Sequence, residues 1–129
     1  MPKHDSIRTP LGRARGLGSS HSGFHHWWAE RLHAVALIPL MLWLLISAAL
    51  LSGEPYNVVR VWVSSPLSAV LLLLCTYNMF VHGWLGLSVV MEDYIEDKWV
   101  RMPLAFCVKG LLIFLGALCS FCIVKIALG

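Results

Sequence analysis

The residues best suited to chemistry lie in the stretch from Val81 to Tyr94. His82 stands inside a long apolar run, and Asp93 and Tyr94 stand where the charges resume. Polar groups deep in a membrane are costly and usually functional. Imidazole is the usual ligand of haem iron, and a phenol can donate a hydrogen bond to a carbonyl group such as that of a quinone. The stretch therefore predicts a metal-ligating histidine at His82 and a quinone contact at Tyr94, with Asp93 tuning nearby protons.

Helix geometry relates these positions to one another. Gly86 follows His82 by four residues, on the same helix face, and leaves room for a flat ring system beside the imidazole. Tyr94 follows His82 by twelve residues, about 18 Å along a helix, so His82 lies near mid-bilayer if Tyr94 lies at the membrane edge. Two plainer alternatives stay open: a packing histidine at His82, and an interfacial acid and tyrosine at Asp93-Tyr94.

A second haem ligand from the same chain is not expected. His33 is the only other histidine in an expected span, and it lies two residues beyond Arg31, about 3 Å deeper. That depth does not match His82. His25 and His26 come before the span, at the surface. The second axial ligand of a six-coordinate haem is therefore expected from another subunit.

Cationic side chains lie near the ends of the expected spans. His25 and Arg31 are six residues apart and could both reach one anionic group. A haem propionate is such a group, and the planar guanidinium suits it. Contact with lipid headgroups is the alternative for both residues. Lys109 is expected to extend its ammonium group towards the interface.

The composition indicates an integral membrane protein. The chain has 129 residues, is 58% hydrophobic and 13% charged, and has a mean hydropathy of +0.73, whereas a soluble domain is about 25% charged. A net charge of +3, spread along the chain, does not suggest nucleic acid. All four cysteines lie in apolar runs, which argues against a disulfide framework or a zinc site. Cys119-x-x-Cys122 is expected to be a pair of inert thiols.

The sequence predicts an all-α integral membrane protein with three transmembrane helices. The expected spans run from about 32 to 52, 66 to 90 and 104 to 127, each about long enough to cross the hydrocarbon core. Pro39 should bend the first span without breaking it. Pro66 suits a helix start, and an interfacial turn is expected around Val58–Val63. Residues 1–23 are expected to form a flexible basic arm, and 24–129 the membrane anchor domain.

The charge distribution predicts the orientation. Most Lys and Arg residues lie in the arm or between the second and third spans, so the positive-inside rule places the N-terminus and the loop at Tyr94 inside. His25, Arg31, Asp93, Tyr94 and Lys109 are then expected at one membrane face. We expect a multi-pass protein of the bacterial cytoplasmic membrane, rather than of the mitochondrial inner membrane.

Six residues carry a resemblance to a known family: His25, Arg31, His82, Gly86, Asp93 and Tyr94. Their pattern is similar to that of the small haem-bearing membrane anchors of succinate dehydrogenase (respiratory complex II). The resemblance covers most of residues 24–128, and the three spans with an inside N-terminus agree with it.

The resemblance implies a cofactor and several partners. A b-type haem would lie between this chain and a second three-helix anchor subunit, with one axial histidine from each and His82 as the ligand here. Ubiquinone would contact Tyr94 near the inside face, with Asp93 beside it. His25 and Arg31 would lie near the propionates and the quinone pocket. The flavoprotein and iron–sulfur subunits would dock on the inside face.

The function implied is that of an anchor subunit passing electrons from the iron–sulfur subunit to ubiquinone, in the respiratory chain and the tricarboxylic acid cycle. It would not be catalytic alone, since no flavin or iron–sulfur motif is found. Two alternatives stay open: a fumarate reductase anchor running in reverse, and a haem-free structural or assembly subunit. A self-contained cytochrome b is disfavoured by the expected lack of a second histidine at the depth of His82.

Overall fold

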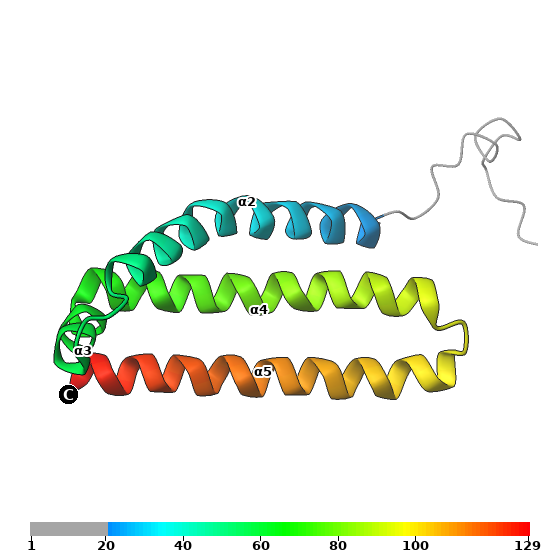
Figure 1. Cartoon of the computed structure of the whole chain (residues 1–129). Coiled ribbons are helices and arrows are strands. Elements are labelled where there is room, and N and C mark those ends of the chain that lie inside the picture. Colours follow the sequence, from blue (N-terminus) through cyan, green and yellow to red (C-terminus); the bar gives the residue numbers. More distant parts are fainter. Residues whose placement is uncertain (1–20) are drawn as a thin grey trace, which may run out of the picture.

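The computed structural model describes residues 21–129, so the arm expected at 1–23 lies almost wholly outside the described residues. The described part is all-helical, with four helices: α2 (His21–Leu50), α3 (Tyr56–Ser64), α4 (Pro66–Tyr94) and α5 (Lys98–Leu128). In Figure 1, α2, α4 and α5 run lengthwise and α3 lies across one end. Three stretches are long and apolar enough to cross a membrane: Trp27–Leu50, Pro66–Tyr94 and Lys98–Leu128. The predicted fold class is therefore confirmed.

Local signals set where the helices begin. Ser65 caps α4, with its Oγ 3.4 Å from the backbone N–H of Ser68, and Pro66 occupies the first turn as predicted. Asp97 caps α5 by accepting from the backbone N–H of Trp99 at 2.9 Å. The third membrane-spanning helix, α5, thus begins at Lys98, earlier than the predicted span, and Pro103 lies in its second turn.

Two predictions about the first half of the chain are confirmed. α2 continues through Pro39, and Figure 1 shows it bent and unbroken. The turn expected around Val58–Val63 is present as the nine-residue helix α3, and its place at the membrane interface stays a prediction. The indole of Trp62 in α3 stacks on Trp43 of α2, with centroids 5.5 Å apart. This stack ties the crosswise helix to the end of the bundle.

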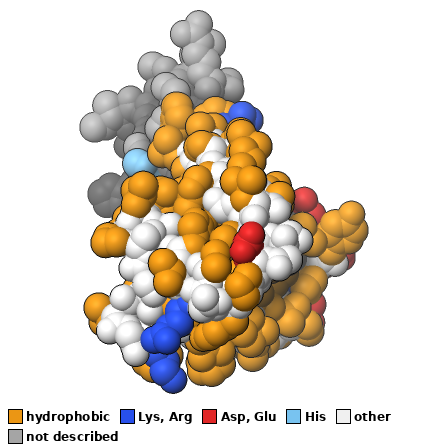
Figure 2. All heavy atoms as spheres, turned by 60° about the vertical axis from the view of Figure 1, so that its left-hand side comes forward, with side chains coloured by type: hydrophobic (Ala, Val, Ile, Leu, Met, Phe, Trp, Pro, Cys, Tyr) orange, Lys and Arg blue, Asp and Glu red, His pale blue; other side chains and the backbone are white. Residues whose placement is uncertain are grey.

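The helix α4 is the centre of the packing. It packs against α2 and against α5, whereas α2 and α5 do not pack together within residues 21–129. Few of the residues that the structure describes are buried: Ser47, Ser68, Ala69, Cys75, Leu85 and Met91. Large apolar side chains remain exposed on every helix, and Figure 2 shows how much of one face they cover. A chain with so small a core requires lipid or partner helices around it.

Candidate functional site

His82 lies on the stripe of α4 that faces α2. Cys75 and Asn78 belong to this stripe and both contact α2: Cys75 Sγ lies 3.8 Å from Sδ of Met41, and Asn78 bonds His33. His82 follows Asn78 by four residues, so it shares this side of the helix. Its Nδ1 is buried and has no hydrogen-bond partner in the described part of the chain. Such an atom is costly unless a ligand or another chain pairs with it.

The helix surface next to His82 is open. A Cβ atom added at Gly83 or Gly86 would meet no heavy atom within 4 Å. Gly86 shares the stripe of His82, so the imidazole borders a backbone surface free of side chains. One histidine beside an open glycine surface fits the edge of a flat macrocycle such as haem b. Among residues 21–129, no three His, Cys, Asp or Glu side chains gather to form a metal site.

His33 lies deeper than predicted. Its Nδ1 is 2.7 Å from Oδ1 of Asn78, one helical turn from His82. The amide of Asn78 donates to the carbonyl of Leu74 at 2.8 Å, so its oxygen faces the imidazole and His33 Nδ1 must carry the proton. The predicted depth mismatch between His33 and His82 is therefore wrong.

The error came from where the first helix was expected to begin. α2 begins at His21, and the hydrogen bond between His33 and Asn78 places His33 about one helical turn from the level of His82. Depth no longer excludes His33 as a second ligand. The hydrogen bond to Asn78 already engages Nδ1 of His33, which favours a packing role for this residue.

Asp93 and Tyr94 form the exposed end of α4. Tyr94 is the last helical residue and is 83% exposed, and Asp93 is exposed beside it. The backbone N–H of Ile95 bonds the carbonyl of Met91, which ends the helix. The fold thus keeps Asp93 and Tyr94 together and separates them from His82 by about 18 Å of helix.

Arg31 does not share the level of Tyr94. It lies inside the first apolar stretch, two residues from His33, so its backbone is about level with Phe80 on the antiparallel α4. The prediction that Arg31 marks the same membrane face as Asp93 and Tyr94 is wrong for its backbone. Its side chain turns back towards the start of α2, with Cζ 4.1 Å above the ring of Trp27. His25 is exposed near that start.

Two residues of this region were missed in the sequence. Asn78 is an amide in the apolar run of α4, one turn before His82, and Trp27 is one turn before Arg31. Polar residues in a span and aromatic–cation pairs at i, i+4 are both recognisable signals. The first signal marks Asn78 as a residue that needs a partner, and the second predicts the contact between Trp27 and Arg31.

Comparison with known proteins identifies the family. The profile described as "Succinate dehydrogenase/Fumarate reductase transmembrane subunit" matches residues 5–123. The chain belongs to this family. It is 32% identical over 103 residues to the succinate dehydrogenase hydrophobic membrane anchor subunit of Rickettsia bellii, covering 80% of this chain and 82% of that protein. The corresponding subunit of Rickettsia conorii is 30% identical over 118 residues, covering 87% and 94%. That of Paracoccus denitrificans is 30% identical over 100 residues, covering 78% of each. The resemblance to succinate dehydrogenase membrane anchors is confirmed.

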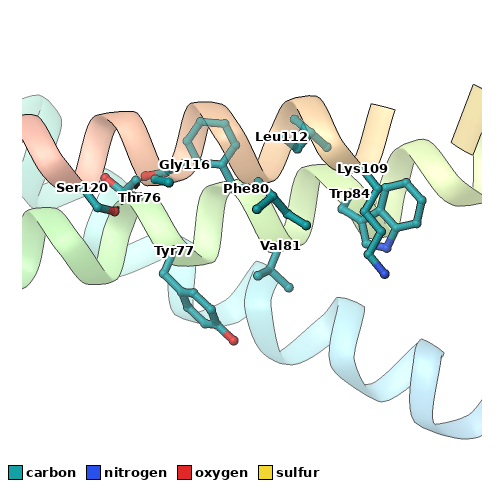
Figure 3. Close-up of a pocket in the computed structure, with 11 residues that line it drawn as sticks. Thr76, Tyr77, Phe80, Val81, Trp84, Lys109, Leu112, Gly116 and Ser120 are labelled. Atoms are coloured by element: carbon teal, nitrogen blue, oxygen red, sulfur yellow. Dashed lines mark hydrogen bonds between the residues drawn. The ribbon is translucent and has the colours of Figure 1, made fainter. Parts of the chain in front are cut away.

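The anchor also carries an apolar groove between α4 and α5, with a volume of about 360 Å³ (Figure 3). Lys109 lies at one end, with Nζ 5.3 Å from the centroid of the Trp84 ring. Trp84 follows His82 by two residues, about 200° around the helix, so the groove and His82 lie on opposite sides of α4. The groove is therefore not part of the candidate haem site.

The cysteines of the anchor form no site within residues 21–129. All four are free thiols; Cys75 is buried, and Cys107, Cys119 and Cys122 are exposed on α5. Cys119 and Cys122 are not joined by a disulfide. Their inertness stays a prediction.

Proposed function

We propose that this anchor holds a b-type haem together with a second three-helix anchor subunit and binds ubiquinone at the Tyr94 end of α4. In this role it passes electrons from an iron–sulfur subunit, itself reduced by a flavoprotein subunit, to quinone. The setting would be the respiratory chain and the tricarboxylic acid cycle. The location would be the bacterial cytoplasmic membrane, with the N-terminus inside.

The observation that carries the proposal is the environment of His82. Its buried Nδ1 lacks a partner within the described chain, and the helix surface at Gly86 is open. A metal-ligating histidine usually donates its second ring nitrogen to a further group. A neighbouring subunit that borders the open surface at Gly86 would supply the other axial ligand.

Each residue has a role that follows from its chemistry. His82 would bind iron through Nε2, the other ring nitrogen. The haem would supply a one-electron redox centre. Arg31 and His25 would balance propionate charge. The position of Arg31 near the level of Phe80, with its guanidinium directed back along α2, favours this role. Tyr94 would donate its O–H to a quinone carbonyl, and Asp93 would influence protons beside it.

Replacing His82 tests the haem assignment. In the purified complex, His82→Ala should abolish or shift the absorption and axial-ligand signature of the reduced b-type haem. His33→Leu is the matched control, because His33 lies about one turn away in the same membrane layer and is not assigned as a ligand. An unchanged signature in His82→Ala would contradict the ligand role. Absence of any b-type haem from the native complex would instead support a structural or assembly subunit.

The reverse direction, fumarate reduction, uses the same architecture, and the matching family includes both enzymes. The names of the relatives favour succinate oxidation. Redox titration of the bound quinone and haem distinguishes the two directions, because a low-potential quinol is required for fumarate reduction. Midpoint potentials typical of ubiquinone support the proposal.

A further inference from the structure

A second region that could bind a ligand lies at the other end of the bundle, where α3 meets the end of α5. It is a hollow of about 340 Å³ whose lining includes two cations from different helices. We define it as the α3–α5 hollow by its lining residues: Tyr56, Arg60, Cys122, Lys125, Ile126 and Gly129. It lies at the opposite end of α4 from Tyr94.

The two helices that form the hollow are held together by direct contacts. Ser64 Oγ lies 3.0 Å from the carbonyl oxygen of Ile126 in α5 and 2.8 Å from that of Arg60 in α3. One hydroxyl thus joins the turn that carries Arg60 to the turn that carries Lys125. The stack of Trp62 on Trp43 holds the other side of α3. The two cations are therefore presented by a connected framework.

The hollow is electropositive. Neither Arg60 nor Lys125 forms an ion pair within residues 21–129, and no carboxylate side chain lines the hollow. Figure 2 shows one group of Lys and Arg atoms at the lower left of this face and another near its top, with an acidic side chain between them. Lys125 lies in the last turn of α5, where a cation favours the helix dipole. That effect does not account for Arg60, which lies in the middle of α3.

The setting indicates which anion would bind. α3 is a short amphipathic helix across the end of the spanning helices, the arrangement of a segment lying in the membrane interface. Tyr56, 76% exposed at its start, has the amphipathic ring typical of that layer. Arginine offers a bidentate fork for phosphate and lysine a point charge. Phosphate groups at this depth belong to phospholipid headgroups.

We propose that the α3–α5 hollow binds the headgroup of an anionic phospholipid from the leaflet opposite the Tyr94 loop. A guanidinium and an ammonium group, neither in an ion pair within residues 21–129, favour a net-negative headgroup over a zwitterionic one. The site does not depend on haem or quinone, so this proposal can be tested independently of the proposed function. Its role would be to hold α3 against the end of α5 in the membrane.

The test uses the whole membrane complex that contains this chain, purified and stripped of loosely held lipid. Native mass spectrometry measures the lipid retained after incubation with vesicles of phosphatidylglycerol or of phosphatidylcholine. The native complex should retain phosphatidylglycerol preferentially. Arg60→Gln with Lys125→Gln should weaken this binding about 25-fold, since each basic residue contributes about fivefold. The matched control, Lys98→Gln with Arg101→Gln, removes equal charge at the opposite end and should leave the affinity unchanged.

Equal retention in both double variants, or equal binding of the two lipids, would overturn the proposal. Competition by millimolar inorganic phosphate would also overturn it, since it would indicate a site for a soluble anion. If the double variant fails to assemble, the binding of phosphatidylglycerol to the single variant Arg60→Gln tests the proposal. About fivefold weaker binding of phosphatidylglycerol supports the proposal, and unchanged binding contradicts it.

Discussion

At the scale of single residues, two imidazoles in one membrane layer differ in what their ring nitrogens meet. His33 donates from Nδ1 to Asn78, whereas Nδ1 of His82 has no partner in the described chain. The first arrangement joins two helices of the same chain. The second remains incomplete until another group arrives, which is why His82 is the better candidate for a site shared between subunits.

The His33–Asn78 bond should stabilise the contact between α2 and α4. Asn78→Leu removes the acceptor and should lower the free energy of unfolding by about 1 kcal/mol, the usual size for a polar contact between membrane helices. Thermal or detergent denaturation of the complex, with a double-mutant cycle against His33→Leu, measures the coupling. Strictly additive effects of the two substitutions would mean that the bond contributes nothing.

Tyr94 should act through its hydroxyl group. Tyr94→Phe keeps the ring and removes one hydrogen-bond donor, so succinate:quinone activity should fall about tenfold, the cost of one hydrogen bond of about 1.4 kcal/mol. Succinate oxidation by an artificial acceptor should be unchanged. Tyr77→Phe, on the same helix but far from its end, is the control. Parallel loss of both activities in Tyr94→Phe would argue for a folding defect instead of a quinone contact.

At the scale of the elements, α4 is the helix on which the others depend. It contacts α2 through Cys75 and Asn78, and α5 through Phe80 and Trp84. α4 and α5 approach closely at Gly116, where an added Cβ would lie 3.3 Å from the ring of Phe80. Small residues allow this kind of close packing between membrane helices.

Gly116→Leu should separate α5 from α4. The added side chain would overlap Phe80, and overpacking of this kind costs about 1–3 kcal/mol. Gly110→Leu is the matched control on the same helix, because a Cβ there meets no heavy atom within 4 Å. Thermal unfolding of the two variants should show a loss for Gly116→Leu alone. Similar losses would indicate that leucine is unfavourable on α5 for another reason, such as a partner subunit at Gly110.

At the scale of the whole molecule, three long helices place the α2 start and the Tyr94 loop at one end and α3 at the other. The described part of α5 has no buried residue, and only a few residues of α2 and α4 are buried. Such a chain packs against other subunits in a larger membrane assembly, as its family membership indicates.

The orientation can be measured directly. Glu96→Cys, in the loop after α4, should react with a membrane-impermeant maleimide only from the inside, because the basic residues near it are retained there. Asn57→Cys, in α3, should react only from the outside. The unsubstituted chain measures labelling of its four native thiols. The reverse pattern would invert the predicted topology without changing the fold.

The sequence by itself determined the three spans and the distance from His82 to Tyr94. Long uncharged runs in a membrane satisfy their backbone only as helices, and two residues on one helix are separated by a known rise. Only the tertiary structure decided which residues of the other helices lie at the same level as His82 and Tyr94. The start of α2 mixes polar and aromatic residues, so the sequence pattern does not show that the helix begins at His21. For that reason the sequence alone predicts positions for His33 and Arg31 that are too near the membrane surface. The register between α2 and α4 depends on contacts such as His33 with Asn78, which join residues 45 positions apart in the sequence.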